Sequence, residues 1–295
     1  MSDPIGLCTW IFGHQDQARI AAEASGLGCA GVELFVDIQA QKAASMRDLF
    51  RSHGLRIFSL TPENVDLCHQ DGALRQHAIA YYIKLLDYAV AVGAEAVTIH
   101  EFVGRGEPHD NPEAEEQRLV ETMATLAGAA EQRRVDLLLE PLRPPLVSRI
   151  HTTAAAVALC QQVDSPRLKI VLDTFHLEAA ERDGPGAIAM SCGRLGAVQL
   201  ADRQRLALGQ GGMDVPAYLA ALRGIGFQGP WILECTTGLP SPALQTREVD
   251  LAVLRQRLQA SILLLQRLLP AAHTGDHQPD CGGQAGTGRL ASVDG

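Results

Sequence analysis

Four oxygen-bearing side chains stand at the ends of short apolar runs, and together they could bind a metal ion. Glu140 follows "VDLLL", Asp173 follows "KIVL", Glu234 follows "PWIL", and Gln199 stands near the end of "GAVQL". Three carboxylate oxygens and one amide oxygen are hard ligands, which suit Mn²⁺ or Mg²⁺, with Co²⁺ as a further candidate, better than Zn²⁺. The sequence therefore predicts a divalent-metal site built from these four residues.

Each of the four residues also has an ordinary structural alternative. An acid at a strand end can cap the next helix, and a buried glutamine can be a satisfied interior polar group. Three converging carboxylates with no adjacent lysine, however, would repel one another and have raised pKa values. A divalent cation removes this repulsion, so the metal interpretation is favoured. With four protein ligands, an octahedral ion keeps two positions for adjacent oxygens of a hydroxy-ketone and acidifies the carbon between them.

These side chains converge only if their strands share one edge of a sheet, and a recurring pattern indicates that they do. A helical stretch, a glycine-containing turn and a short apolar strand follow one another along the chain, and "PIGLCTW" adds a first strand. The eight strands are expected within residues 4–10, 25–35, 52–60, 91–100, 130–140, 165–173, 193–202 and 225–234. Apolar strands separated by amphipathic helices predict a parallel sheet covered on both faces.

Eight such units favour an α/β fold of the closed (β/α)8 TIM-barrel type, in which the carboxyl ends of all strands meet at one mouth. An open Rossmann-like sheet is the alternative, but no G-x-G-x-x-G follows the first strand. We expect a single barrel domain over residues 1–270, with a last helix over 249–269 that ends at Pro270. The Gly- and Ala-rich residues 271–295 are expected to form a disordered tail.

Composition narrows the partners and the compartment. The chain has 295 residues with 25 basic and 34 acidic side chains, a formal net charge of −9 and only 4% aromatic residues. Proteins that grip nucleic acid carry basic patches and stacking aromatics, so no nucleic-acid partner is expected. Seven cysteines without a C-x-x-C pair, and an N-terminus without a signal-peptide pattern, indicate a reduced, cytoplasmic protein. No apolar run is long enough to cross a bilayer, so no membrane partner is expected.

Several motifs, found together and in order, resemble the xylose isomerase-like sugar phosphate isomerase/epimerase family. They are "LLLEPLRPP", "IVLDTFHLEAAE" and "VQLADRQRLALGQGGMD", supported by "AGVELF" and "LTPENVDL". The resemblance covers about residues 5–268. It implies a TIM barrel that binds a divalent metal and a small sugar, and it implies that a homodimer or homotetramer can form.

The resemblance also implies roles for individual residues. Glu140 and Glu234 would bind the metal and, as in the ketose 3-epimerase branch, serve as the two acid/base groups. Asp173 would be a metal ligand, His176 would hydrogen-bond the substrate, and Arg205 would reach substrate oxygens or a phosphate. Further candidates are His100 for substrate contact, Trp10 for the pocket wall, and Asp202 for orienting Gln199 or Arg205 from behind.

Two departures from the family pattern bear on the substrate. The commonest pattern has His where this chain has Gln199; glutamine there resembles the hydroxypyruvate isomerase branch and some dehydroshikimate dehydratases, in which the amide oxygen is a ligand. Arg143 stands where "E-P-L-N" is usual. A cation at this position indicates an acidic substrate or a phosphate, or else it is a surface arginine; both interpretations stay open.

The expected function is that of a divalent-metal-dependent sugar isomerase or epimerase. It would act on a small ketose or hydroxy-ketone, phosphorylated or not, through a metal-stabilised enediolate. The alternative is a metal-dependent dehydratase of the keto-cyclitol or dehydroshikimate type, in which the same enolate expels a β-hydroxyl. Remoter alternatives are DNA repair of the endonuclease IV type and a non-catalytic sugar-binding barrel.

Overall fold

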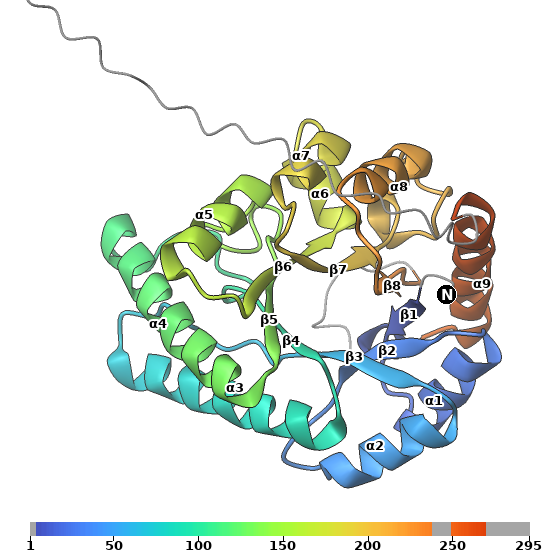
Figure 1. Ribbon diagram of the computed structural model, residues 1–295, viewed down its shortest axis with the longest axis horizontal. Coiled ribbons are helices and arrows are strands. Elements are labelled where there is room, and N and C mark those ends of the chain that lie inside the picture. Colours follow the sequence, from blue (N-terminus) through green and yellow to red (C-terminus); the bar gives the residue numbers. More distant parts are fainter. Residues whose placement is uncertain (1–3, 238–248, 270–295) are drawn as a thin grey trace, which may run out of the picture.

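The chain forms a closed barrel of eight parallel strands, paired in sequence order from β1 to β8, with β8 returning to β1 (Figure 1). The computed structural model describes residues 4–237 and 249–269. The strands are β1 (Ile5–Cys8), β2 (Gly31–Phe35), β3 (Arg56–Thr61), β4 (Ala96–Ile99), β5 (Asp136–Leu139), β6 (Leu168–Asp173), β7 (Leu195–Leu200) and β8 (Trp231–Leu233). The predicted (β/α)8 barrel is confirmed, and each strand lies inside its expected segment, except that β3 extends one residue beyond it, to Thr61. The predicted tail, residues 271–295, lies outside the described residues.

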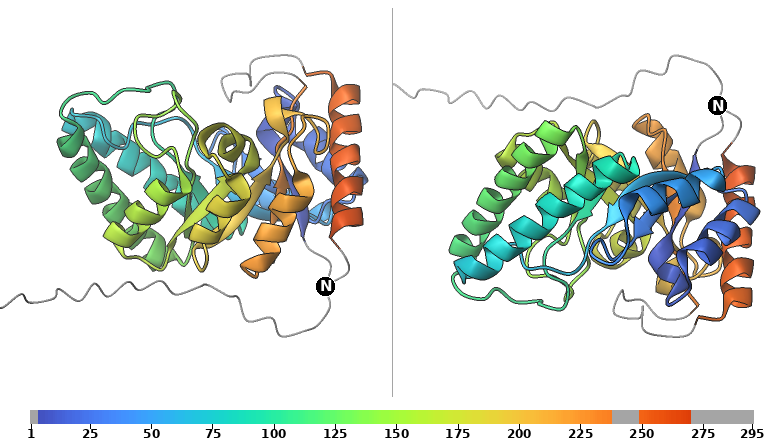
Figure 2. Two further views of the ribbon diagram at one scale, coloured as in Figure 1. Left: turned by 90° about the horizontal axis from the view of Figure 1, so that it is seen from above. Right: turned by 90° about the horizontal axis from the view of Figure 1, so that it is seen from below.

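Helices cover the barrel on its outer side, as the amphipathic stretches predicted (Figures 1 and 2). They are α1 (Gln17–Gly26), α2 (Ala43–Ser52), α3 (Gly72–Val92), α4 (Pro112–Arg133), α5 (Thr153–Val163), α6 (Thr174–Ala180), α7 (Gly184–Met190), α8 (Val215–Gly224) and α9 (Leu251–Leu268), with short 3₁₀ helices η1 (Thr9–Phe12) and η2 (Arg203–Arg205). The last helix, predicted over 249–269, is α9, which lies beside α1 through an Arg255–Glu23 ion pair. None of the helices within the described residues is long and apolar enough to cross a membrane.

Caps explain where several helices begin. Asp71, Asn111, Asp214 and Asp250 each accept a backbone N–H of the first turn of the helix that follows, α3, α4, α8 and α9 respectively. Such a side chain satisfies an N–H group that has no partner inside the helix, which stabilises a helix start by about 1 kcal/mol. Each of these four helices therefore begins at a defined residue.

Two glycines permit close packing where the barrel closes. A Cβ on Gly6 of β1 would come 2.5 Å from the carbonyl oxygen of Gly31 and 2.7 Å from the ring of Phe58. A Cβ on Gly31 would meet the same ring at 2.6 Å. The Phe58 ring therefore occupies space beside β1 and β2 that side chains at these two positions would otherwise fill.

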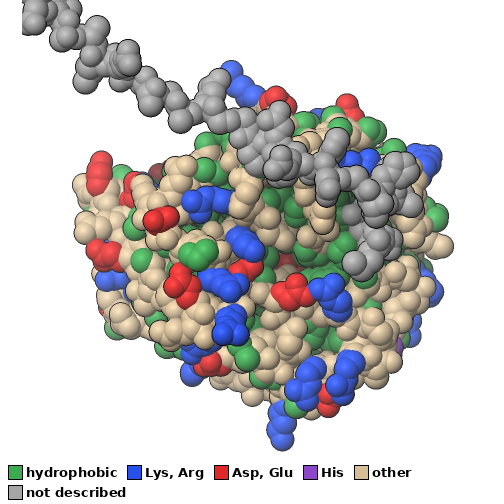
Figure 3. Space-filling view, viewed as in Figure 1, with side chains coloured by type: hydrophobic (Ala, Val, Ile, Leu, Met, Phe, Trp, Pro, Cys, Tyr) green, Lys and Arg blue, Asp and Glu red, His purple; other side chains and the backbone are tan. Residues whose placement is uncertain are grey.

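Basic and acidic side chains are interspersed on the face seen in Figure 3, and apolar side chains gather near its centre.

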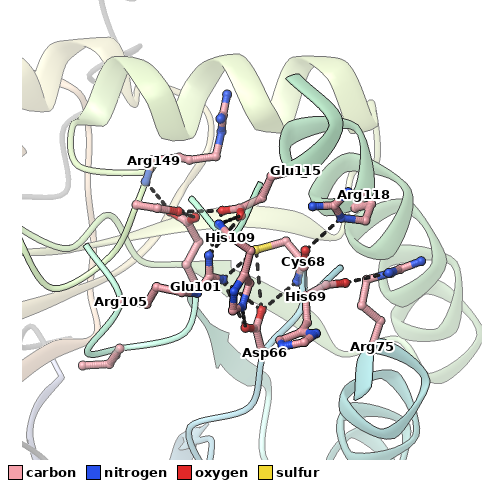
Figure 4. A network of polar contacts seen from close by, with 12 residues as sticks. Asp66, Cys68, His69, Arg75, Glu101, Arg105, His109, Glu115, Arg118 and Arg149 are labelled. Atoms are coloured by element: carbon pink, nitrogen blue, oxygen red, sulfur yellow. Dashed lines mark hydrogen bonds and ion pairs between the residues drawn. The ribbon is translucent and has the colours of Figure 1, made fainter. Parts of the chain in front are cut away.

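The loops at the carboxyl ends of β3, β4 and β5 are tied together by buried charged groups (Figure 4). Arg105 donates to both oxygens of Asp66, at 3.0 and 3.1 Å, and to both oxygens of Glu115, at 2.9 and 3.0 Å. Glu115 is fully buried and also accepts from Ser148, at 2.8 Å. One arginine thus joins three loops.

The same loops form one wall of a cavity at the carboxyl ends of the strands. Asn64 both donates to and accepts from the backbone of Val103, at 2.9 and 2.8 Å, and the N–H of Gly104 donates to Leu146, at 2.7 Å. Val103 and Leu146 line that cavity. Arg105 follows Val103 by two residues in the chain. The contacts of Arg105 with Asp66 and Glu115 therefore also hold this wall in position.

We predict that Arg105→Met lowers the free energy of unfolding by about 3 kcal/mol, because it leaves two carboxylates in the interior without their cation. Urea unfolding followed by circular dichroism measures this change. Arg19→Met is the matched control: Arg19 pairs with Glu23 on the surface, so a loss of at most about 0.5 kcal/mol is expected. Equal losses in the two variants would contradict the role assigned to the network.

Candidate active site

A cavity of about 40 Å³ lies at the barrel mouth, and most of the predicted site residues line it. The lining residues are Trp10, Glu33, Thr61, His100, Val103, Glu140, Leu142, Leu146, His176, Gln199, Arg205 and Glu234. The remaining predicted ligand, Asp173, joins this group through contacts with Arg205 and His176. The structure thus brings together the residues that the sequence assigned to metal and substrate.

Parallel pairing places the four predicted ligands at one level. Asp173 is the Cα partner of Gln199 in the register of β6 and β7. Glu140 and Glu234 continue β5 and β8 by one residue, and their N–H groups donate to Ile99 and Leu200 of the neighbouring strands, each at 2.9 Å. All four side chains are at least 92% buried, with exposed fractions of 8% or less. The sheet therefore forces three acids and one amide into a small, dry volume.

Arg205 supplies the cation that sequence reasoning did not place among the carboxylates. Its guanidinium pairs with Asp173 Oδ2 and with Glu234 Oε2, each at 2.8 Å. The guanidinium carbon lies 5.6 Å from the centroid of the Trp10 ring and 4.6 Å from that of Phe175. Burial between two aromatic rings strengthens such pairs by removing water.

The backbone that carries Arg205 is strained. Gln204 and Arg205 both have left-handed conformations, with φ of 59° and 57°, which cost a non-glycine residue roughly 1–3 kcal/mol each. Asp202 holds this loop: its carboxylate accepts the N–H groups of Arg203, Gly209 and Met213 at 2.7–2.9 Å. Asp202 was expected to orient Gln199 or Arg205; its hydrogen bonds instead go to the loop backbone, so it acts on Arg205 only through that backbone.

Glu140 and Asp173 hold their protons more tightly than usual. Burial, then the charges of Glu234, Asp173 and Glu33, raises the pKa of Glu140 well above its ordinary value. Burial also raises the pKa of Asp173 to about 7, although the adjacent Arg205 opposes the shift. Among the described side chains of the site, four carboxyl groups face one guanidinium. A divalent cation would balance most of the remaining negative charge.

The glutamine is oriented as a ligand. Gln199 Nε2 donates to Glu33 Oε1 at 2.9 Å, whereas its buried Oε1 accepts a hydrogen bond from none of the described residues. A buried amide oxygen without a partner is costly, and a cation would satisfy it. This free oxygen, together with the three acids, fits the hard donor set predicted for Mn²⁺ or Mg²⁺.

Sequence reasoning missed Glu33. It lies in β2 with no exposed surface and accepts from Ser59 Oγ and Thr61 Oγ1, each at 2.9 Å, as well as from Gln199. The available signal was an acid in the middle of the apolar run "AGVELF". Unlike the four predicted ligands, Glu33 does not end its strand, so the rule that singled out strand ends passed over it.

Two histidines of the site have fixed hydrogen-bonding roles. His176 Nδ1 accepts the N–H of Arg143 at 3.4 Å, and its Nε2 lies 3.3 Å from Arg205 Nη2, which can only donate, and 3.5 Å from Asp173 Oδ2. Burial and the charges of Arg205 and Arg143 lower the pKa of His176 well below its ordinary value, so the ring is neutral. His100 Nδ1 donates to the Glu101 carbonyl at 2.7 Å, which leaves Nε2 as an acceptor. His100 thus offers an acceptor at the cavity, whereas both ring nitrogens of His176 face N–H groups of arginines.

A second group of metal-ligating side chains is Asp66, His69 and His109, beside a cavity of about 480 Å³. Its hydrogen bonds are already made. Asp66 accepts from Arg105, from the N–H of Cys68 and from His109 Nε2, and His69 Nδ1 accepts the N–H of Asp71. With Arg105 in contact, a cation here would be repelled, so this group belongs to the network that fixes the loops.

Comparisons with known proteins agree with this geometry. The model of the xylose isomerase-like TIM barrel family matches residues 21–257. D-psicose 3-epimerase of Enterocloster bolteae is 29% identical over 126 residues, which are 43% of this chain and 42% of that protein. L-ribulose 3-epimerase of a Methylomonas species is 25% identical over 195 residues, 65% of this chain and 68% of that protein. For the first of these relatives the aligned region is thus less than half of its length.

One more sequence relative and one solved structure are also similar to this chain. 3-Dehydroshikimate dehydratase of Pseudomonas putida is 31% identical over 134 residues, 41% of this chain and 21% of that protein. Among solved structures, D-psicose 3-epimerase of Clostridium cellulolyticum H10 with D-tagatose superposes with a TM-score of 0.82 at 21% identity, covering 92% of this chain and all of that one. The fold is therefore shared beyond the matched sequence. On the match to residues 21–257, this chain belongs to the xylose isomerase-like TIM barrel family.

Proposed function

We propose that this protein is a metal-dependent sugar epimerase or isomerase that acts on a small ketose or hydroxy-ketone. The observation that carries the proposal is the unpartnered amide oxygen of Gln199, buried among Glu140, Asp173 and Glu234. These four residues would hold Mn²⁺, Mg²⁺ or Co²⁺. When bound, such an ion acts as a Lewis acid that acidifies the carbon beside a carbonyl. The names of the relatives, D-psicose and L-ribulose 3-epimerase, support a ketose as substrate.

Two carboxyl groups of the protein would carry out the two proton transfers, one as the base and the other as the acid. We assign the role of the base to Glu234, whose Oε1 accepts a hydrogen bond from Trp10 Nε1 at 2.7 Å and whose Oε2 forms an ion pair with Arg205 Nη1 at 2.8 Å. The raised pKa of Glu140 keeps a proton on that carboxyl, which suits the acid. Two carboxyl groups with environments this different can exchange one proton with the substrate. Return of the proton to the same carbon is epimerisation, and return to its neighbour is isomerisation.

The other groups of the cavity hold the substrate. His176 lines the cavity beside Arg205, His100 offers an Nε2 acceptor, and Arg205 is a cation that reaches substrate oxygens. Trp10, Leu142 and Leu146 give the cavity apolar walls that exclude water. This combination binds a short polyhydroxy chain and keeps the reacting carbon dry.

Protons and a metal ion compete for the same buried carboxyl groups. We therefore predict that a bound metal stabilises the protein more at high pH than at low pH. Because the pKa of Asp173 is about 7 in the folded protein and about 4 when unfolded, the metal-free fold binds more protons than the unfolded chain in this range and loses stability as pH rises. Mn²⁺ must displace these protons. At a hundredfold excess over Kd it should raise Tm by roughly 5–10 °C at pH 8, and by clearly less at pH 5.5.

Differential scanning calorimetry of the chelator-treated protein, with and without MnCl₂ at both pH values, measures this effect. KCl at equal ionic strength is the control for screening. A rise in Tm of the same size at pH 5.5 and pH 8 would contradict the assignment of the buried carboxyl groups as ligands.

We predict that Glu140→Gln and Glu234→Gln each lower substrate proton exchange by about 10²–10⁴-fold, since each removes an acid/base group. The measurement is deuterium incorporation in D₂O, read by NMR, with Mn²⁺-loaded protein and a panel of D-psicose, L-ribulose, D-fructose, hydroxypyruvate and keto-cyclitols. Glu95→Gln, a substitution in a surface ion pair with Arg56, is the control and should exchange like the wild type. Near-wild-type exchange in both active-site variants would refute the proposed function.

A second candidate, dehydration of an acidic keto compound, is favoured by Arg143. Its guanidinium carbon lies 5.2 Å from the Phe175 ring centroid, its backbone N–H contacts His176, and it pairs with none of the described carboxylates. The relative from Pseudomonas putida named 3-dehydroshikimate dehydratase supports this alternative. An arginine without a counter-charge at the cavity edge suits an anionic substrate.

If dehydration is the reaction, Arg143→Gln should raise KM for 3-dehydroshikimate at least about tenfold, the loss expected for one charged hydrogen-bonded contact. Formation of the conjugated product is followed by its ultraviolet absorbance. Exchange of a neutral ketose by the same variant is the control and should be unchanged. Absence of the new absorbance with wild-type protein would exclude this substrate for the second candidate.

A further inference from the structure

The terminal amide of Gln199 has two ends that differ in their use to a cation. The oxygen can be a ligand, whereas the NH₂ group carries hydrogens and repels a cation. A rotation of about 180° exchanges the two ends without changing the volume of the side chain. Something outside Gln199 must therefore decide which end faces the cluster of Glu140, Asp173 and Glu234.

Glu33 lies on the opposite side of this amide, and both of its carboxyl oxygens accept hydrogen bonds. Its Oε1 receives Gln199 Nε2 and Thr61 Oγ1, each at 2.9 Å, and its Oε2 receives Ser59 Oγ at 2.9 Å. The side chain has no exposed surface, so water does not take the place of these donors. The Glu33 carboxylate in β2 is thus an acceptor of N–H and O–H hydrogen bonds.

We propose that Glu33 is a positioning residue that turns Gln199 into an oxygen ligand. The inference rests on the metal site of the proposed function. With the amide reversed, Gln199 Oε1 would face the Glu33 carboxylate at hydrogen-bond distance, acceptor against acceptor, and the NH₂ group would face the cation. The observed orientation avoids both conflicts, since it gives the NH₂ group to Glu33 and leaves Oε1 without a partner among the described residues.

Glu33 also adds a negative charge near the cluster, and this effect must be separated from positioning. Glu33→Asp keeps the charge but shortens the side chain, which withdraws the carboxylate from the Gln199 amide. Glu33→Gln keeps the length but removes the charge and can hydrogen-bond either orientation of the amide. A pure charge effect would spare the Asp variant and would not depend on residue 199.

The test is a double-mutant cycle on the full chain, with Mn²⁺ as the probe. Isothermal titration calorimetry of chelator-treated protein gives Kd for the wild type, Glu33→Asp, Glu33→Gln and Gln199→Ala, and for each Glu33 variant combined with Gln199→Ala. Ser59→Ala is the matched control, because it removes a donor from Glu33 but leaves both its charge and its contact with Gln199. Circular dichroism and Tm of the metal-free proteins identify any variant that fails to fold.

We expect each Glu33 variant to weaken Mn²⁺ binding about 10- to 100-fold when residue 199 is Gln, the usual loss when a group that orients a ligand is removed. In the Gln199→Ala background the same changes should cost less than about threefold, because no amide is left to orient. Ser59→Ala should stay within about threefold of the wild type.

Three results would overturn the inference in distinguishable ways. Equal losses in both backgrounds would mean that Glu33 acts by charge alone. Wild-type affinity in a folded Glu33→Asp variant would mean that the contact with Gln199 does not orient the ligand. Absence of Mn²⁺ binding by the wild type would remove the proposed function itself, and this inference with it.

Discussion

The burial of several carboxyl groups in one small volume is the constraint on which this structure depends. Glu33, Glu140, Asp173 and Glu234 are each at least 92% buried at the barrel mouth, and among the described side chains only Arg205 pairs with them as a cation. Such a cluster is unfavourable unless protons or cations neutralise it. The raised pKa of Glu140 and the strained backbone at Arg205 are both consequences of that requirement.

The barrel is what makes this concentration of charge possible. Parallel strands bring the residues that end each strand to one rim, and the shared register sets Asp173 beside Gln199. Interlocked loops then hold the wall, because Arg105 joins Asp66 to Glu115 behind Val103. The free energy lost in crowding the acids is thus offset by a frame whose loops are held by paired charges.

Much of this arrangement could be predicted from the sequence, for reasons that are local. Short apolar runs between amphipathic stretches marked all eight strands, and an acid at the end of such a run marked Glu140, Asp173 and Glu234. What could not be predicted depends on distance in space. The pairing of Arg205 with two acids requires the left-handed turn at Gln204, and the hydrogen bond between Glu33 and Gln199 joins residues 166 positions apart. No short window of sequence contains either contact.

Two clusters of metal-ligating residue types differ in their role: one supports the loops, and the other is the candidate site of the chemistry. Asp66, His69 and His109 are the residue types of a metal site, yet the oxygens of Asp66 already accept four donors, and an arginine occupies the place where a cation would bind. In the cluster at the mouth, by contrast, Gln199 Oε1 is buried and free. Judged by residue type alone, the two clusters are equally good candidates for a metal site. Judged by unused hydrogen-bonding capacity, the cluster at the mouth is the better candidate. Leaving a buried polar atom without a partner is costly, and a cation bound among the acids would satisfy this one; that is the physical reason to propose the chemistry at the barrel mouth.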